Sequence, residues 1–254
     1  MRKAPNGSGL FLCVCFDSAK ASQAICYNGP MILKSRFSIT RIFLAVLALS
    51  VLWCSAAQAG SFKVARINGS VPATLKSYVH WAKVASLTQG GSNPGVVAVP
   101  PRYGSCVRTL HKKGYSWKKA WSECRSQFAA YNENVMSLLI TSSWILGEAK
   151  ERNLSVTAAQ VNAKFNQTKK AAFPTEKAFR EFLRSSGESV GDIKGRLKVD
   201  LLSDKIRADV TKGLNDSQAQ DALTRFVRAF QSKWKSRTTC NRSFAVDICG
   251  HRAK

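Results

Sequence analysis

Residues with acid–base chemistry are spread thinly along this 254-residue chain. Four aspartates fall within one stretch: Asp192, Asp200, Asp204 and Asp209. Only Asp200 and Asp204 are four residues apart, and lysines and arginines alternate with them, a pattern that ion pairing along a helix surface explains. His80 stands alone beside Trp81 and fits a structural or solvated position better than a catalytic one. No Ser/His/Asp or Cys/His arrangement can be assembled, so we predict a protein that is not an enzyme and uses no cofactor.

Cysteines are the other residues with distinctive chemistry. Four of the eight lie beyond residue 60: Cys106, Cys124, Cys240 and Cys249. An even number in an exported chain indicates disulfides, and the simplest of three pairings is Cys106–Cys124 with Cys240–Cys249. Zinc binding is the alternative, but neither pair has C-x-x-C spacing, and His111 and His251 complete no familiar ligand pattern. We therefore predict two disulfides and no metal.

Apolar and aromatic residues repeat with heptad spacing between residues 116 and 150. The stripe consists of Trp117, Trp121, Cys124, Phe128, Tyr131, Val135, Leu138 and Ile145. It predicts one helix of about nine turns, roughly 50 Å long, in which Trp117, Trp121 and Phe128 pack between helices. A helix of that length is too long for the centre of a compact globule, so the molecule is expected to be elongated.

Shorter patterns indicate the remaining elements. A short strand or hairpin is expected at residues 62–69, then a helix at 73–87 and a loop rich in glycine and proline at 89–105. The long helix should end near Arg152 or Asn153. Later helices are expected from Thr157, from Pro174 to Gly187, from Ser189, and from Ser217. The predicted fold class is mainly α, an elongated multi-helix domain with one long helix and a short N-terminal β element.

The first 59 residues contain a segment with the composition of an export signal. Residues 31–59 combine a basic start, an apolar run from Ile42 to Trp53 that is too short to cross a bilayer, and the small-x-small sequence Ala57-Gln58-Ala59. We interpret them as a signal peptide cleaved near Ala59, which predicts an extracytoplasmic protein. Residues 1–30 are interpreted as an over-extended, disordered gene start. The alternatives are a signal anchor with a cytoplasmic tail, and lipidation at Cys54.

The chain is strongly basic. Its formal net charge is +24, and loss of residues 1–59, with six basic residues and one acidic residue, leaves +19. Such a charge favours anionic partners, including envelope polymers, a membrane surface and acidic protein segments. One face of the last helix is basic: Arg225, Arg228, Lys233, Lys235 and Arg237. The alternative is an ordinary solvated surface, and nucleic acid is not expected because no nucleic-acid motif is present.

The order of these elements resembles the N-terminal chaperone domain of SurA-like proteins and of the related PrsA-type foldases. The matching segments are residues 64–69, residues 157–161 with Phe165, residues 173–176 with Phe179, Phe182 and Leu183, and residues 190–202. The resemblance covers about residues 62–212. The segment from Phe226 to Cys249 is similar to the returning C-terminal segment of some members. Residues 60–254 are thus expected to form one domain, with a helix at 216–238 packing back and a tail at 240–249 closed by a disulfide.

The resemblance implies an ATP-independent holdase for unfolded or partly folded exported proteins. Many members carry a parvulin-type prolyl isomerase domain before the last segment, but residues 210–216 lead directly into the final helix here. Isomerase activity is therefore not expected. Six aromatic residues are candidates to line a peptide-binding cleft, with an ordinary core position as the alternative for each: Trp81, Trp144, Phe165, Phe173, Phe179 and Phe182. The second functional hypothesis is binding of polyanions, such as DNA or acidic envelope polymers, through the last helix.

Overall fold

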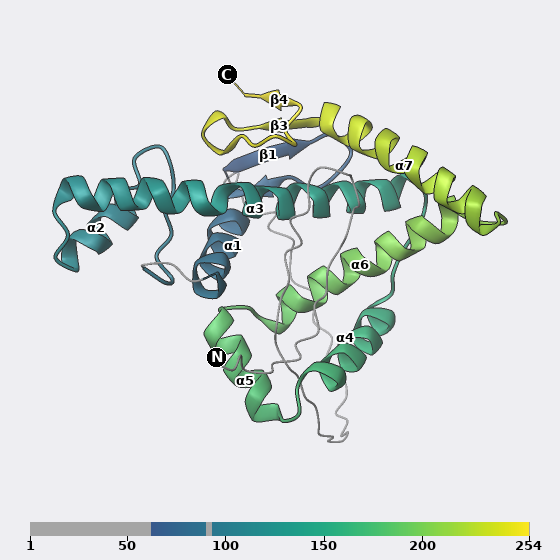
Figure 1. Ribbon diagram of the computed structural model, residues 1–254, viewed down its shortest axis with the longest axis horizontal. Coiled ribbons are helices and arrows are strands. Elements are labelled where there is room, and N and C mark those ends of the chain that lie inside the picture. Colours follow the sequence, from purple (N-terminus) through teal and green to yellow (C-terminus); the bar gives the residue numbers. More distant parts are fainter. Residues whose placement is uncertain (1–61, 90–92, 254) are drawn as a thin grey trace, which may run out of the picture.

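The fold is mainly α, as predicted. The structure, a computed structural model, describes residues 62–89 and 93–253, so the predicted gene start and signal peptide lie outside the described residues. Within the described ranges the chain forms seven α-helices, a short 3-10 helix and one small sheet of four strands. Figure 1 shows an open arrangement in which the helices spread out from one long central helix.

Most elements follow one another along the chain with short connections. Their bounds are β1 (Lys63–Ile67), β2 (Ala73–Thr74), α1 (Leu75–Thr88), α2 (Gly104–Lys112), α3 (Trp117–Glu151), α4 (Ala158–Ala172), α5 (Glu176–Ser186), α6 (Val190–Val210), α7 (Asp216–Ser236), β3 (Thr238–Cys240), the 3-10 helix (Arg242–Phe244) and β4 (His251–Arg252). The longest connection, residues 89–103, joins α1 to α2.

The long helix α3 is the axis of the molecule. It runs for 35 residues, begins at the N-cap Ser116 and ends at Arg152, where the sequence predicted it to end. The main core forms along its second half, where Tyr131, Val135, Ile140 and Ile145 are buried against α1, α6, α7 and the sheet. In Figure 1 α3 runs horizontally from the left of the molecule past its centre, and α1 and α6 lie below it.

The sheet joins segments from both ends of the described chain. Its order is β2-β1-β3-β4, with β1 antiparallel to β2 and to β3, and β3 parallel to β4. Ala65 of β1 lies opposite Cys240 of β3. The turn after β1 uses Gly69, whose φ of 87° is the left-handed conformation that glycine tolerates best. The N-terminal β element is confirmed, but its partner strand β3 was not predicted, since three residues carry too little pattern.

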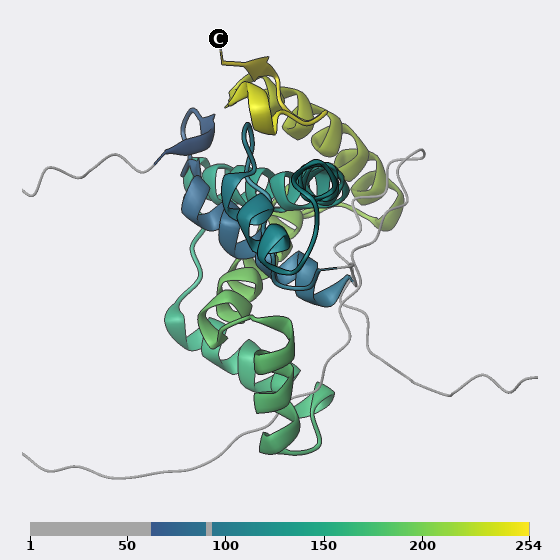
Figure 2. The same cartoon turned by 90° about the vertical axis from the view of Figure 1, so that its left-hand side faces the viewer.

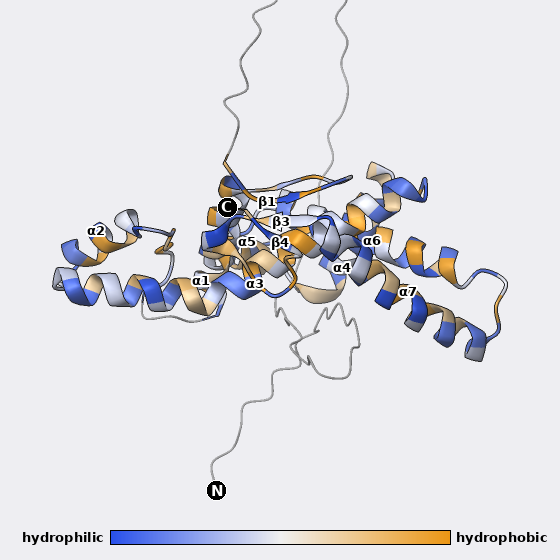
Figure 3. Ribbon diagram, turned by 90° about the horizontal axis from the view of Figure 1, so that it is seen from above, coloured by the Kyte–Doolittle hydropathy of each residue, from blue (hydrophilic) through white to orange (hydrophobic). Residues whose placement is uncertain are grey.

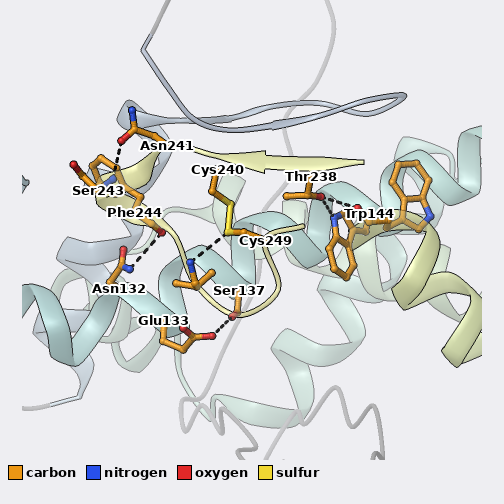
Figure 4. The surroundings of a disulfide bond; sticks show 12 residues. Asn132, Glu133, Ser137, Trp144, Thr238, Cys240, Asn241, Ser243, Phe244 and Cys249 are labelled. Atoms are coloured by element: carbon orange, nitrogen blue, oxygen red, sulfur yellow. Dashed lines mark hydrogen bonds between the residues drawn. A yellow bond between two sulfur atoms is a disulfide. The ribbon is translucent and has the colours of Figure 1, made fainter. Parts of the chain in front are cut away.

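The C-terminal tail closes over the sheet and α3. Figure 4 shows the Cys240–Cys249 disulfide between β3 and the following loop. Beside it, the indole Nε1 of Trp144 donates a 2.7 Å hydrogen bond to the Thr238 hydroxyl. Phe244 is 2 % exposed and meets the Tyr78 ring edge-on at 4.8 Å. The tail is thus part of the core, and the disulfide adds about 3 kcal/mol through the unfolded chain.

Both disulfide pairings are confirmed. Cys106 joins Cys124 and Cys240 joins Cys249, with Cα–Cα distances of 6.0 and 5.8 Å. Their sulfurs are bonded to one another, so they are not zinc ligands. Two disulfides are compatible with an extracytoplasmic location. In the part of the chain that the structure describes, no helix combines the length and the apolar character that crossing a bilayer requires.

Helices α4, α5 and α6 form a lobe with a core of its own. Phe165, Phe173, Phe179 and Leu197 are buried together there, apart from the main core. Figures 1 and 2 show this lobe lying away from the sheet, on the other side of α3. We call α4, α5 and the first half of α6 the α4–α6 lobe.

One helix was not predicted, and one boundary differs from the sequence predictions. Helix α2 (Gly104–Lys112) begins inside the segment predicted as a loop and was missed, because glycine and proline dominate the composition just before it. Helix α7 begins at the N-cap Asn215, whose side chain accepts from the amide of Gln218, rather than at Ser217. Both pairs, Asn215–Gln218 and Ser217–Gln220, have capping-box spacing, and the sequence alone does not choose between them.

Candidate functional site

The basic face of α7 is only partly available. Lys233 contacts Glu148 at 2.5 Å and Glu151 at 2.6 Å, and Arg237 contacts Glu151 at 2.5 Å. These pairs fix α7 to the end of α3. Of the five basic residues predicted for polyanion binding, the other three are exposed along the helix: Arg225, Arg228 and Lys235. The predicted polyanion surface is therefore smaller than the sequence indicated, because two of its charges hold the fold together.

Glu148 is the centre of this contact. It is 4 % exposed and accepts hydrogen bonds from Lys233 Nζ, from Trp234 Nε1 at 2.7 Å and from Arg152 Nε at 2.8 Å. Burial alone would raise the pKa of Glu148, but these donors outweigh burial and hold it below its ordinary value. Burial would lower the pKa of Lys233, but its hydrogen bonds to the carboxylates of Glu148 and Glu151 raise it overall. The polar groups of this network form hydrogen bonds and ion pairs with one another, so its role is structural.

Four of the six aromatic residues predicted to line a cleft lie in cores. Phe165, Phe173 and Phe179 are 4–7 % exposed and meet edge-on in the α4–α6 lobe. Trp144 is 4 % exposed and packs against Phe230 in the main core. In this structure these four do not line an open cleft, because the helices of each core cover them. All four therefore occupy ordinary core positions, which was the alternative for each.

The other two, Trp81 and Phe182, are half-buried: Trp81 packs against the main core, and Phe182 packs against the core of the lobe, 5.3 Å from Phe173. Helix α1 packs against α5, and Arg196 of α6 lies over the Trp81 ring at 5.3 Å. The apolar side chains on the lobe side are only partly covered: Phe182, Leu183, Val190 and Ile193. We call the contact of α1 with α5 and the start of α6 the α1–lobe junction.

Polar pairs run across and beside this junction. His80 Nε2 lies 3.0 Å from Asp192 Oδ1, and Arg196 pairs with the buried Glu188 at 2.5 Å. Burial would raise the pKa of Asp192, but hydrogen bonds from Ser189 and the contact with His80 lower it overall. The aspartates of α6 were predicted to pair along their own helix. Asp192 instead pairs with α1, and Asp209 pairs with Arg152 of α3 at 2.6 Å, because α6 packs between other helices.

A second surface lies at the opposite end of α3. Residues 102–125, which we call the α2–α3 tip, form a helical hairpin whose two helices are joined by the Cys106–Cys124 disulfide. The tip has a small core of its own, made mainly of Tyr103, Val107, Leu110 and Ala120 with the two cysteines. Figures 1 and 3 show the tip projecting beyond α1, away from the rest of the molecule.

Two tryptophans are exposed on this tip. Trp117 is 56 % exposed and Trp121 is 43 % exposed, so the prediction that they pack between helices is wrong. Ala120 and Cys124 of α3 face α2 instead, so each indole lies at the edge of that contact, against His111 for Trp117 and Tyr103 for Trp121. Phe128, further along the same stripe, does pack between elements, 5.9 Å from both Tyr103 and Phe244.

No family model, curated protein or solved structure matches this chain. Among the described residues, the α1–lobe junction and the α2–α3 tip are the two candidate functional surfaces. Among these residues no group of histidine, cysteine and carboxylate side chains is placed to hold a metal ion.

The tip also concentrates unpaired positive charge. Seven basic residues on it are exposed: Arg102, Arg108, Lys112, Lys113, Lys118, Lys119 and Arg125. Within the described residues none of them lies in an ion pair, and Glu123 is the tip's one carboxylate. The doublets Lys112-Lys113 and Lys118-Lys119 beside two tryptophans are visible in the sequence. The heptad spacing predicted buried indoles, whereas the lysine doublets beside them indicate an exposed, charged surface.

A small cavity lies at the base of the tip. It lies between α1, α3 and residues 96–98 and has room for only about one water molecule, and Tyr78, Phe128 and Tyr131 line it together with Gln127. Pockets that bind small molecules usually hold about 300–1,000 Å³. This cavity is therefore a packing gap rather than a substrate site, and the two surfaces remain the candidates for function.

Proposed function

We propose that this protein is an extracytoplasmic, ATP-independent chaperone that holds unfolded or partly folded exported chains and has no prolyl isomerase activity. The resemblance of residues 62–212 to the N-terminal chaperone domain of SurA-like proteins supports the proposal. So does the mainly α architecture with a returning C-terminal helix and tail. The direct passage from α6 to α7 leaves no segment there for an isomerase domain.

The α1–lobe junction is the observation that carries the proposal. A holdase needs apolar contact area of low specificity beside polar groups that keep the complex in solution. Beside this junction the lobe carries the half-buried Phe182, Leu183 and Ile193, which pack against its own core, and α1 carries the half-buried Trp81. The lobe has its own core, so it can shift relative to α1 without losing its internal packing.

The polar pairs at the junction fit the same role. His80–Asp192 is a single contact between partly exposed side chains, and such pairs contribute about 1 kcal/mol or less. A contact of that strength aligns α1 with the lobe without fixing them. Client segments of different shape can then displace it and pack against the apolar side chains beside it.

Aggregation assays test the proposal. The protein should suppress aggregation of several reduced, unrelated model proteins at modest molar excess without ATP. Phe182→Ser should raise the amount needed for half suppression several-fold, while Leu214→Ser, which changes a 40 % exposed apolar residue between α6 and α7, should leave it unchanged. Absence of suppression by the parent protein for all clients would reject the chaperone function.

Photo-crosslinking locates the client surface without relying on a loss of activity. Benzoylphenylalanine in place of Phe182 should crosslink to a bound client. The same group in place of Phe62, an aromatic residue that is 51 % exposed at the start of β1, serves as the control. Suppression of aggregation with equal crosslinking at both positions would keep the function and reject the junction as its site.

A further inference from the structure

The α2–α3 tip carries a feature that client binding at the junction does not use. Trp117 and Trp121 are one helical turn apart on α3 and therefore lie on the same side of it. His111 stacks on Trp117 at 3.9 Å, while Tyr103 meets Trp121 edge-on at 6.0 Å. The two indoles are thus fixed in place and still about half exposed. Tryptophan is enriched where an apolar phase meets water, because its ring is apolar and its N–H needs a polar partner.

The charge around these indoles is almost all positive, since Glu123 is the one carboxylate of the tip. Lys118 and Lys119 follow Trp117 directly, Arg125 lies 5.7 Å from the Trp121 ring, and Lys112 with Lys113 occupies the end of α2. Arg225, Arg228 and Lys235 of α7 are likewise exposed, but the tryptophan of that helix, Trp234, is buried, so the tip differs in combining its cations with exposed indoles. A cluster of four to eight basic residues without counter-charges is the composition that recognises anionic lipid headgroups.

The shape of the tip selects among anionic partners. It is a projecting end, as Figures 1 and 3 show, rather than a groove. Proteins that bind single-stranded nucleic acid track it along a basic groove and stack bases on free aromatic faces. Here one face of Trp117 is already covered by His111. A convex end with two indoles and surrounding cations fits a flat anionic surface better.

We propose that the α2–α3 tip docks the protein on the anionic surface of a lipid bilayer. Trp117 and Trp121 enter the headgroup region, and the surrounding lysines and arginines pair with lipid phosphates. The Cys106–Cys124 disulfide holds the hairpin in its docking conformation before it binds, so binding loses little conformational entropy. The inference does not depend on the chaperone function, since it uses a different surface.

Vesicle co-sedimentation tests the proposal with the disulfide-bonded protein. Binding is expected to phosphatidylcholine vesicles that contain phosphatidylglycerol, and not to phosphatidylcholine alone, and it should fall with salt. Lys118→Gln with Lys119→Gln should weaken binding by roughly thirtyfold, since each lysine near an anionic surface contributes about a fivefold factor. The matched control is Arg225→Gln with Arg228→Gln on α7, which should bind like the parent. Equal weakening by both pairs would overturn the tip as the site.

Brominated lipids report insertion of the indoles. They should quench part of the tryptophan fluorescence of the parent, and that quenching should disappear in Trp117→Ala with Trp121→Ala, whose binding falls by roughly tenfold or more. Leu214→Ser should leave both quenching and binding unchanged. Binding to soluble acidic polymers or DNA without binding to anionic vesicles would overturn the proposal. Unchanged suppression of aggregation by the tip variants in membrane-free assays would separate this surface from the chaperone site.

Discussion

Gly147 tests the packing of α7 on α3 most directly. A Cβ at this position would lie 2.2 Å from Cη2 and 2.7 Å from Cζ3 of Trp234, and 2.9 Å from the Cβ of Ser70. Ordinary carbon contacts lie at about 3.5–4.0 Å, so the indole would have to retreat by more than an ångström. Trp234 is fully buried and its N–H is held by Glu148, which leaves the ring no free space.

The expected change in the free energy of unfolding for Gly147→Ala follows from two opposing contributions. Overpacking in a well-packed core costs typically about 1–3 kcal/mol, and three contacts under 3 Å place this site near the upper end. Replacing a helical glycine by alanine returns about 1 kcal/mol. Gly147→Ala should therefore destabilise the protein by about 2 kcal/mol. At roughly 2–4 °C per kcal/mol for a domain of this size, Tm should fall by about 4–8 °C.

Gly195 provides the matched control. It also lies inside a helix, α6, but a Cβ there meets nothing within 4 Å. Gly195→Ala should therefore gain about 1 kcal/mol and raise Tm by about 2–4 °C. Thermal unfolding followed by far-UV circular dichroism, with the disulfides intact, measures both variants. A Gly147→Ala protein as stable as Gly195→Ala would refute the close contact between α3 and Trp234.

Three further predictions concern stability at other positions. Glu148→Gln should lower the free energy of unfolding at neutral pH by about 2 kcal/mol, because charge-assisted hydrogen bonds to Lys233 and Arg152 are lost. The pKa of Glu148 is lowered in the folded state. The difference in free energy of unfolding between the parent and Glu148→Gln should therefore be full above the ordinary carboxyl pKa and shrink as pH falls through the folded value. Urea unfolding at neutral and acidic pH measures this difference, and a difference that stays constant with pH would contradict the prediction. Asn215→Ala should cost about 1 kcal/mol, whereas Ser217→Ala should cost much less, because only Asn215 caps α7; equal losses in urea unfolding would contradict the assignment.

Much of the helical scaffold follows from local pattern. The capping residues Thr157 and Ser189, and Gly187 after α5, mark helix ends at the predicted positions because capping depends on neighbours within three or four residues. The end of α3 at Arg152 was likewise predicted. Both cysteine pairings are local in sequence and were also predicted.

Long-range packing is what the sequence did not disclose. Heptad spacing placed Trp117 and Trp121 on the same stripe as Tyr131, but burial also depends on where the partner helix packs, and α2 packs on Ala120 and Cys124. In the same way, Lys233 and Arg237 belong to a basic face by periodicity. Their pairing with Glu148 and Glu151 depends on how α7 crosses α3, which no spacing within α7 specifies.

The pairing of β1 with β3 determines the order in which this protein can fold. During synthesis β1 is made among the first of the described residues and β3 among the last, so β1 has no partner on that side until nearly the whole chain exists. The α4–α6 lobe and the α2–α3 tip are built from consecutive segments and can form earlier, since local contacts require little loop closure. The main core closes last, and until then the exposed edge of β1 is open to pairing with other chains.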